Sequence, residues 1–222
     1  MRGIVLLSGG LDSTTCLGVA KNECEHVYTM SFDYGQRHKL ELERSAMISK
    51  KYGADKHKLV RLDIADLLES ALTNHNIEVP DFEEGEEIPI TYVPARNTIF
   101  LSIALGWAES LDADHIYIGV SEIDYSGYPD CRPEYIAKYN ELILLATKKG
   151  VTGRAITIKS PLANLNKADT IKLGIENGID YADTISCYSI SPEGKACGKC
   201  DSCEYRRRGF SEAGVEDPTV YL

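Results

Sequence analysis

The densest group of chemically reactive side chains is a cluster of cysteines near the end of the sequence. The chain has seven cysteines, and four of them fall within 17 positions: Cys187, Cys197, Cys200 and Cys203. Four thiolates are the ligand number of a closed structural zinc site. A redox Cys-x-x-Cys pair needs only two thiols, so an iron–sulfur cluster is the stronger alternative. We predict one structural Zn²⁺ per chain, held by these four cysteines.

A second candidate site is the string Ser8-Gly9-Gly10-Leu11-Asp12-Ser13, which follows a short apolar run. Glycine permits a positive φ and a close approach of the backbone to a ligand, and Ser8, Ser13 and Thr14 add hydroxyl donors. A helix that starts here would point its free N–H groups at a bound anion. The string is neither a Walker loop nor the glycine fingerprint of dinucleotide folds. It predicts a phosphate site of another type, with a plain strand–turn–helix connection as the alternative.

These residues need a framework, and the apolar pattern predicts one. Strands are expected at 3–7, 27–32, 58–62, 115–120 and 155–158. Helices are expected at 13–22, 38–52, 98–109, 133–149 and 167–177. This alternation indicates an α/β fold: three α/β/α layers around a mostly parallel five-stranded sheet. Ligands of such sheets bind at the carboxyl ends of the strands, so we expect the chemistry in the loops that follow them.

Composition narrows the classes of protein. The chain has 222 residues, of which 43% are hydrophobic and 26% charged, as in an ordinary globular protein. The net charge is −10, whereas proteins that neutralise nucleic-acid phosphates usually have a basic excess. No run of 18 apolar residues occurs, and the first apolar run meets Gly-Gly and not a small-residue cleavage site. We therefore expect a cytoplasmic protein that binds neither membranes nor nucleic acid directly.

The Ser-Gly-Gly-Leu-Asp-Ser string resembles the PP-loop of the adenine-nucleotide α-hydrolase superfamily. Members typically adenylate a carbonyl oxygen of the substrate and release pyrophosphate, and a nitrogen or sulfur nucleophile then displaces AMP. The resemblance implies ATP with Mg²⁺ as co-substrate. It also implies that Asp12 helps to place Mg²⁺, although a helix cap is the alternative for this residue. The ATP phosphates would be held by Ser8, Gly9, Gly10, Leu11, Asp12, Ser13 and Thr14.

Five segments together resemble the 7-cyano-7-deazaguanine synthase family, from one end of the chain to the other. They are SGGLDS, MSFDYGQRH at 30–38, VPARN at 93–97, SGYPDCRPEYI at 126–136 and the cysteine tail. The resemblance implies conversion of 7-carboxy-7-deazaguanine, ammonia and ATP into the nitrile, a free-base precursor of queuosine, by way of the amide. It favours a homodimer. It also implies a PP-loop ATP-binding domain at 1–185 and a zinc-binding tail packed on it at 186–222.

The same resemblance suggests which residues handle ATP. Arg96 and Lys167 are expected to neutralise the pentacoordinate α-phosphate, with a surface salt bridge as the alternative for each. Phe32 is expected to line the adenine pocket, although core burial is the better interpretation of this residue alone. Asn97 either touches a ligand or caps the helix that follows.

Residues 124–134 follow the fourth expected strand and suit recognition of the deazaguanine. Such a ring needs acceptors for its N–H groups, a stacking face and a cation for its carboxylate. The candidates are Asp124, Tyr125, Tyr128, Asp130 and Arg132, with a polar loop as the alternative. Cys131 is not expected to be a nucleophile, because adenylation needs no covalent enzyme intermediate. His38 is either reactive or a structural residue at a helix start.

Two further segments have open interpretations. Residues 69–92 are polar and acidic, which is typical of a solvated surface loop, although a lid over the site is the alternative. Arg206, Arg207 and Arg208 are expected to form a solvated helix end, with phosphate or dimer contacts as the alternative.

Two other functions compete with the synthase. One is a PP-loop enzyme that acts on tRNA, such as a thiolase or a lysidine-type ligase, which the acidic charge disfavours. The other is a nucleotide-sensing zinc protein of the same fold, which would bind ATP without turnover that depends on a second substrate.

Overall fold

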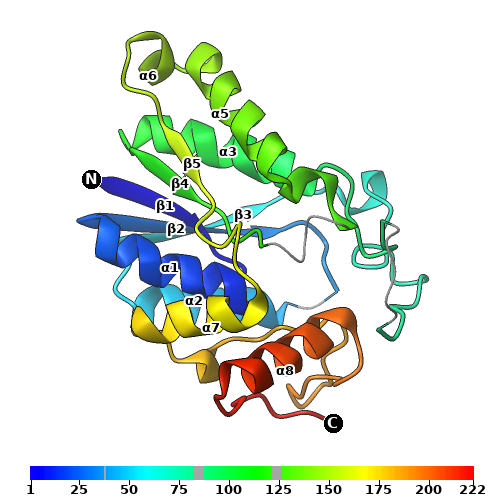
Figure 1. The fold of residues 1–222 in the computed structure, drawn as a ribbon. Coiled ribbons are helices and arrows are strands. Elements are labelled where there is room, and N and C mark those ends of the chain that lie inside the picture. The colour runs from blue at the N-terminus through cyan, green and yellow to red at the C-terminus, as the bar shows by residue number, and fades with distance from the viewer. Residues whose placement is uncertain (38, 83–87, 122–126) are drawn as a thin grey trace.

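The computed structural model describes residues 1–37, 39–82, 88–121 and 127–222. Its centre is a sheet in the order β3-β2-β1-β4-β5. All four strand pairings are parallel, and the order of the strands is visible in Figure 1. The strands are β1 (Arg2–Leu6), β2 (His26–Asp33), β3 (Lys56–Arg61), β4 (His115–Tyr117) and β5 (Thr157–Lys159). The predicted parallel five-stranded sheet is confirmed.

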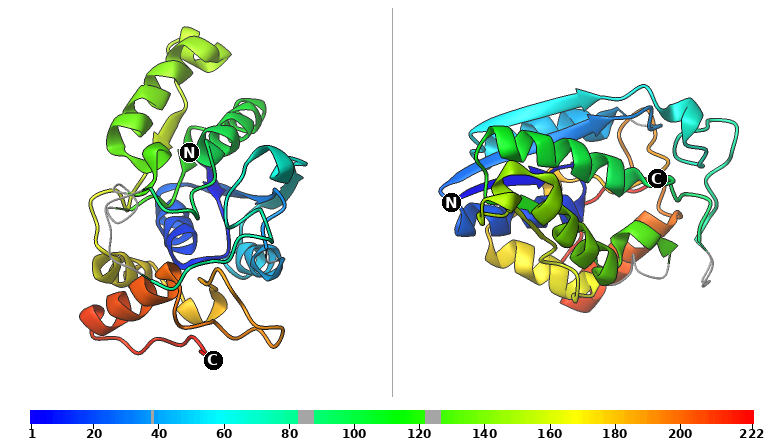
Figure 2. Two further views of the ribbon diagram at one scale, coloured as in Figure 1. Left: turned by 90° about the vertical axis from the view of Figure 1, so that its right-hand side faces the viewer. Right: turned by 90° about the horizontal axis from the view of Figure 1, so that it is seen from above.

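Helices cover both faces of the sheet because side chains alternate along each buried strand. Ile4 and Leu6 face a cluster that includes residues of α3 and α5, whereas Val5 and Leu7 face residues of α1 and α2. Figures 1 and 2 show these two layers on opposite sides of the sheet. The helices are α1 (Leu11–Glu23), α2 (Leu40–Lys51), α3 (Arg96–Ser110), α5 (Pro133–Ala146), α6 (Lys148–Val151), α7 (Lys167–Glu176) and α8 (Asp201–Ala213). Short 3₁₀ turns lie at Ala65–Leu67, Pro129–Cys131 and Tyr181–Asp183.

The expected single helix at 133–149 is wrong, because the chain breaks between α5 and α6. Thr147 is extended, with φ −124° and ψ 149°, and its Oγ1 accepts the Gly150 N–H at 2.9 Å. A Cβ on Gly150 would collide with the Ile143 carbonyl, so only glycine allows the chain to double back here. Thr147 thus starts a new helix instead of continuing the first.

The strand expected at 115–120 is also shorter than predicted, since its pairing with β5 stops at Tyr117. The chain then approaches the start of α1 very closely: a Cβ on Gly119 would lie 3.0 Å from the Ser13 nitrogen. This close approach brings the segment after β4 to the end of β1. None of the helices in the described ranges is long and apolar enough to cross a membrane.

The tail contains α8, which packs on α7 beyond the second helix layer (Figure 1). The expectation of a solvated end is wrong for Arg206, whose side chain is 1% exposed, while Arg207 and Arg208 are exposed as predicted. Arg206 donates to Asp217 Oδ1 at 3.0 Å, to Thr184 Oγ1 at 2.8 Å and to the Tyr181 carbonyl at 3.2 Å. These partners satisfy the buried guanidinium and join α8 to the chain that follows α7.

Candidate active site and metal centre

A cavity of about 290 Å³ opens at the carboxyl ends of the strands. Its walls include the end of β1, Phe32 of β2 and the residues that follow β4. β1 lies between β2 and β4. The strands β2 and β3 are added on one side of β1 and the strands β4 and β5 on the other, so the strand order reverses at β1. Ligands of doubly wound sheets bind at this switch point. The cavity is therefore where the sequence places the chemistry.

The PP-loop curls over the end of β1. Gly9 has φ +91°, and a Cβ there would lie 2.7 Å from the Glu41 carbonyl oxygen, so glycine is required. The Ser8 N–H donates to Ser13 Oγ at 3.1 Å, and Thr14 Oγ1 donates to the Gly10 carbonyl at 2.8 Å. The cavity is lined by four of the predicted phosphate residues: Ser8, Gly10, Asp12 and Ser13. Leu11 and Thr14 are buried and shape the loop from behind.

The tail holds this loop directly. The Ile185 N–H donates to the Gly9 carbonyl at 3.0 Å, and Ser186 Oγ accepts the Leu11 N–H at 3.2 Å. Ile185, Ser186 and Cys187 also line the cavity. Segments separated by some 175 residues therefore build one wall of the site.

Asp12 and Lys167 form an ion pair at the rim. Lys167 Nζ lies 2.8 Å from Asp12 Oδ1 and 2.9 Å from Oδ2. Lys167 is the first residue of α7, and α8 makes room for it: a Cβ on Gly209 would lie 2.5 Å from Lys167 Cγ. The N-cap of α1 is Gly10, with no side-chain cap bond, and the Asp12 carboxylate is engaged by Lys167 instead. The structure thus brings together two predicted residues of opposite charge.

Arg96 reaches the same cavity from the first position of α3. The residue before it, Ala95, has φ 53°, a left-handed conformation that is uncommon outside glycine. The Tyr92 hydroxyl accepts the Ala95 N–H at 3.1 Å and supports this turn. Burial is the largest single influence and opposes the Arg96 charge, but the interactions with Tyr34, Cys131 and Tyr128 together outweigh it and raise the pKa of Arg96. Arg96 is therefore a fixed cation inside the site.

The residues predicted to bind the deazaguanine have four different positions. Tyr128 lines the cavity, and its hydroxyl lies 3.1 Å from Thr91 Oγ1. Asp130 is buried beneath α3, where its Oδ2 accepts the Asn97 N–H at 2.9 Å, so it caps that helix. Arg132 is exposed, donates to the Pro129 carbonyl at 3.2 Å and is not among the lining residues. Asp124 and Tyr125 lie outside the described residues, as does His38.

Two aromatic rings form the apolar wall. Phe32 stacks on Phe100 with ring centroids 3.9 Å apart and an interplanar angle of 3°. Both rings line the cavity, although Phe32 is only 6% exposed and belongs to the main hydrophobic cluster. The two interpretations of Phe32 are therefore compatible: it is a core residue with one edge at the site.

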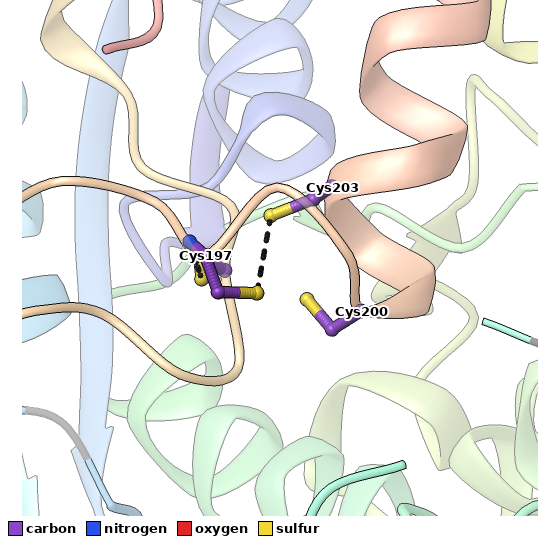
Figure 3. A group of neighbouring side chains, drawn as sticks. Cys197, Cys200 and Cys203 are labelled. Carbon is purple, nitrogen blue, oxygen red and sulfur yellow. Dashed lines mark hydrogen bonds between the residues drawn. The ribbon is translucent and has the colours of Figure 1, made fainter. Parts of the chain in front are cut away.

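The four tail cysteines converge as a metal site requires. Their sulfur atoms all lie within 4.8 Å of one another, and Cys197 Sγ and Cys203 Sγ are 3.9 Å apart. Tetrahedral zinc with Zn–S bonds of about 2.3 Å needs S–S separations near 3.8 Å. The Cys197 N–H donates to Cys187 Sγ at 3.2 Å, and such donors suit thiolates. Figure 3 shows Cys197, Cys200 and Cys203 pointing toward a common centre. The donor set therefore fits a metal ion.

Comparison with known proteins identifies the family. The family model described as queuosine biosynthesis protein QueC matches residues 2–214. The chain belongs to this family. It is 58% identical over 221 residues to the 7-cyano-7-deazaguanine synthase of Coxiella burnetii, covering 100% of this chain and 98% of the relative. The enzyme of the same name from Legionella pneumophila is 57% identical over 220 residues, at 99% and 96% coverage.

Solved structures show the same fold at low sequence identity. NMN synthetase from Francisella tularensis has a TM-score of 0.51 at 13% identity, covering 97% of this chain and 77% of that one. A predicted tRNA methyltransferase subunit from Methanocaldococcus jannaschii has a TM-score of 0.51 at 16% identity, with 100% and 92% coverage. At such identities the likeness concerns the fold alone.

The structure adds several lining residues to those predicted for this family member. They are Tyr34, Gln36, Arg37, Glu41, Thr91, Phe100, Ser186, Tyr188 and Ser202. Burial raises the pKa of Glu41 to about 7, and the charge of Arg96 opposes this rise. Tyr34, Gln36, Arg37 and Glu41 lie in or just after the segment MSFDYGQRH. Their position after an expected strand is the feature of the sequence from which a place at the cavity could be predicted. The others come from distant segments and carry no such signal.

The acidic segment 69–92 is anchored at both described ends. Arg37 Nε donates to the Ala71 carbonyl at 2.6 Å, and the Ala71 N–H donates to the Ile90 carbonyl at 2.8 Å. Leu72 and Thr91 line the cavity. Near the tail, the Phe82 N–H donates to the Lys199 carbonyl at 2.9 Å. This segment therefore borders the cavity and the cysteine cluster, so it is more than a solvated surface loop.

Proposed function

We propose that the chain is an ATP-dependent ligase that converts 7-carboxy-7-deazaguanine and ammonia into 7-cyano-7-deazaguanine for queuosine biosynthesis. The observation that carries this proposal is full-length identity of 57–58% to synthases of that name. The cavity supports it, because it combines a phosphate-binding loop, a buried cation and aromatic walls in one place.

The proposed reaction activates a carbonyl oxygen with ATP twice. A carbonyl oxygen is a poor leaving group until the α-phosphorus of ATP is attached to it. Activation of the carboxylate lets ammonia form the amide, and activation of the amide oxygen lets that oxygen leave as the nitrile forms. Both activations place the same substrate carbon next to the α-phosphorus of an ATP molecule, a different ATP each time, so one cavity serves both.

The PP-loop and the two cations would bind ATP. Ser8, Gly10 and Ser13 present hydroxyl and backbone groups to the phosphates at the start of α1. Arg96 and Lys167 would neutralise charge that develops at the α-phosphorus, because fixed cations in a cavity stabilise a transition state without reorganising. Asp12 would exchange part of its bond to Lys167 for Mg²⁺, which supplies charge neutralisation on the phosphates. Gly9, Leu11 and Thr14 would hold the loop in shape.

The deazaguanine would bind on the side of the cavity opposite the PP-loop. Tyr128 offers an aromatic face and a hydroxyl there, and Phe32 would border the adenine. Asp130 would act indirectly, because it caps the helix that carries Arg96. Asp124, Tyr125 and Arg132 stay proposed contacts for the amino group, the ring N–H and the carboxylate.

The tail would hold structural Zn²⁺ through Cys187, Cys197, Cys200 and Cys203. We propose an ATP-binding domain at 1–185 and a zinc-binding tail at 186–222, divided just before the first proposed zinc ligand, Cys187. Elemental analysis should find about one zinc per chain, as a four-cysteine site implies. Iron with visible absorbance would instead indicate a cluster. We also expect a cytoplasmic homodimer, which light scattering and fractionation would test.

The decisive assay mixes the protein with ATP, ammonium and 7-carboxy-7-deazaguanine and detects the base by mass spectrometry. The nitrile should form, preceded by the amide, and tRNA should have no effect. The proposal is overturned if no nitrile appears while tRNA stimulates pyrophosphate release. ATP binding without pyrophosphate release under any of these conditions would indicate a nucleotide sensor.

A further inference from the structure

The proposed reaction consumes ammonia, but near neutral pH the nitrogen arrives as ammonium. Ammonium has no lone pair and cannot attack the activated carboxylate. One proton must pass to an acceptor, which leaves neutral ammonia. The N–C bond then forms, the bond from carbon to the AMP oxygen breaks, and a second proton leaves as the amide appears. The site therefore needs a group that attracts a small cation and takes one proton from it.

Few groups among the described lining residues meet both needs. Asp12 is a carboxylate, but both its oxygens lie within 2.9 Å of Lys167 Nζ. Arg96 and Arg37 are cations, and Arg37 Nε is committed to the Ala71 carbonyl. Tyr34 is buried, and that burial raises its pKa further from neutrality. Glu41 is the other carboxylate on the described wall.

We propose that Glu41 binds the ammonium ion at the cavity wall and accepts its proton, which makes Glu41 a catalytic residue for amide formation. This inference rests on the proposed function. In the step, one N–H bond of ammonium breaks and a carboxyl O–H bond forms. The electron pair stays on nitrogen, and the proton later leaves through the cavity to solvent.

The fold holds Glu41 beside the PP-loop. It is the second residue of α2, and its carbonyl oxygen packs against Gly9, so the PP-loop and the start of α2 are in contact. Glu41 is half-buried, and it is one of the residues that line the cavity. Ammonium bound there would lie next to the PP-loop, which is proposed to bind the ATP phosphates.

The surrounding charges suit a base that switches near neutral pH. Burial raises the pKa of Glu41 to about 7, and Arg96 limits that rise. A carboxylate with this pKa takes a proton from a bound cation far more readily than an exposed glutamate does. Other titratable groups face the cavity from each surrounding element: Tyr34 and Arg37 after β2, Asp12 on α1 with its partner Lys167 on α7, Tyr128 and Cys131 after β4, and Cys187 and Tyr188 in the tail.

The test compares Glu41→Gln with Glu43→Gln, an exposed glutamate on the same helix. Amide formation is measured at varied ammonium concentration, and hydroxamate formation is measured with hydroxylamine, which is already uncharged at neutral pH. In Glu41→Gln we expect kcat/KM for ammonium to fall about 10²-fold or more, mostly through a raised KM. With hydroxylamine the loss should be below about tenfold, and the Glu43→Gln variant should match the wild type.

The pH profile gives a second readout. Wild-type kcat/KM for ammonium, corrected for free ammonia, should rise through about pH 7, and Glu41→Gln should lack this rise. An unchanged KM for ammonium in Glu41→Gln, or an equal loss with hydroxylamine, would overturn the inference. Melting curves of both variants exclude unfolding as the cause. A wild-type protein that forms no nitrile would instead refute the proposed function, so the two failures are distinguishable.

Discussion

Ionisable side chains lie at both ends of the central sheet, and the two ends surround them differently. At the amino end, Lys149 is 9% exposed and fully engaged: its Nζ donates to the Ala113 carbonyl at 2.7 Å and contacts Asp112 at 3.1 Å and Asp114 at 3.6 Å. At the carboxyl end, Arg96 and Glu41 face a cavity instead of a closed set of partners.

The difference separates architecture from function. A buried charge whose donors all find acceptors holds elements together, as Lys149 holds the starts of β4 and α6. A charge that faces an open volume has capacity left for a ligand. The Asp12–Lys167 pair lies between these cases. Its two charges pair with each other, and Asp12 also lines the cavity.

The largest effect is expected for Arg96→Ala. Loss of a fixed cation at the reacting phosphorus should lower kcat about 10²- to 10³-fold, while the melting temperature changes little. Steady-state pyrophosphate release and a thermal melt check this. If the variant keeps its kcat but melts at a much lower temperature, Arg96 is a structural cation like Lys149.

Lys149→Met should show the reverse. The Ala113 carbonyl loses its partner, whereas Asp112 and Asp114 are 58% and 42% exposed and remain hydrated. The free energy of unfolding should fall by about 2 kcal/mol with kcat unchanged, as measured by urea denaturation and turnover. A drop in kcat without a drop in stability would break the comparison.

Gly209→Ala tests the intermediate pair. The new Cβ would strike Lys167 Cγ and push the ammonium group off Asp12. We expect KM for ATP to rise about tenfold and stability to fall by about 1 kcal/mol. Gly153→Ala is not a matched control because its φ is +80°, whereas Gly106 has open space and helical geometry, so Gly106→Ala should leave KM unchanged.

The smallest effect concerns the stability of the Glu41 site. The folded pKa of about 7 lies above the unfolded value, so folding favours the protonated acid. As pH rises from about 4.5 to about 7, wild-type stability should fall relative to Glu41→Gln, by about 1 kcal/mol after allowance for solvent in the cavity. Melts at pH 5 and pH 8 measure this. A constant difference across that range would contradict the raised pKa.

Local patterns made much of this structure predictable. Most strands and helices and the convergence of the four cysteines agree with the sequence, whereas β4 is shorter than expected and the helix expected at 133–149 is divided. The break at Thr147 was missed because it depends on close packing of Gly150 against the Ile143 carbonyl. The burial of Arg206 was missed because its partners Thr184 and Asp217 come from separate segments.

The site itself was predictable only in part for the same reason. Asp12 and Lys167 were expected near the phosphates, but their mutual pairing depends on α7 and α8 lying together. Glu41 is an ordinary first-turn glutamate in sequence, and only the folded structure shows that it lines the cavity. Ser186 contacts the PP-loop across 175 positions.

In the proposed reaction both substrate oxygens leave on the α-phosphorus of ATP, each with its own AMP, in this one cavity. The direct test supplies 7-carboxy-7-deazaguanine with both carboxylate oxygens labelled with ¹⁸O and examines the products by mass spectrometry. One labelled oxygen should appear in AMP for each of the two activations, so two labelled AMP molecules form per nitrile. Label found in inorganic phosphate or in water, with unlabelled AMP, would contradict the account.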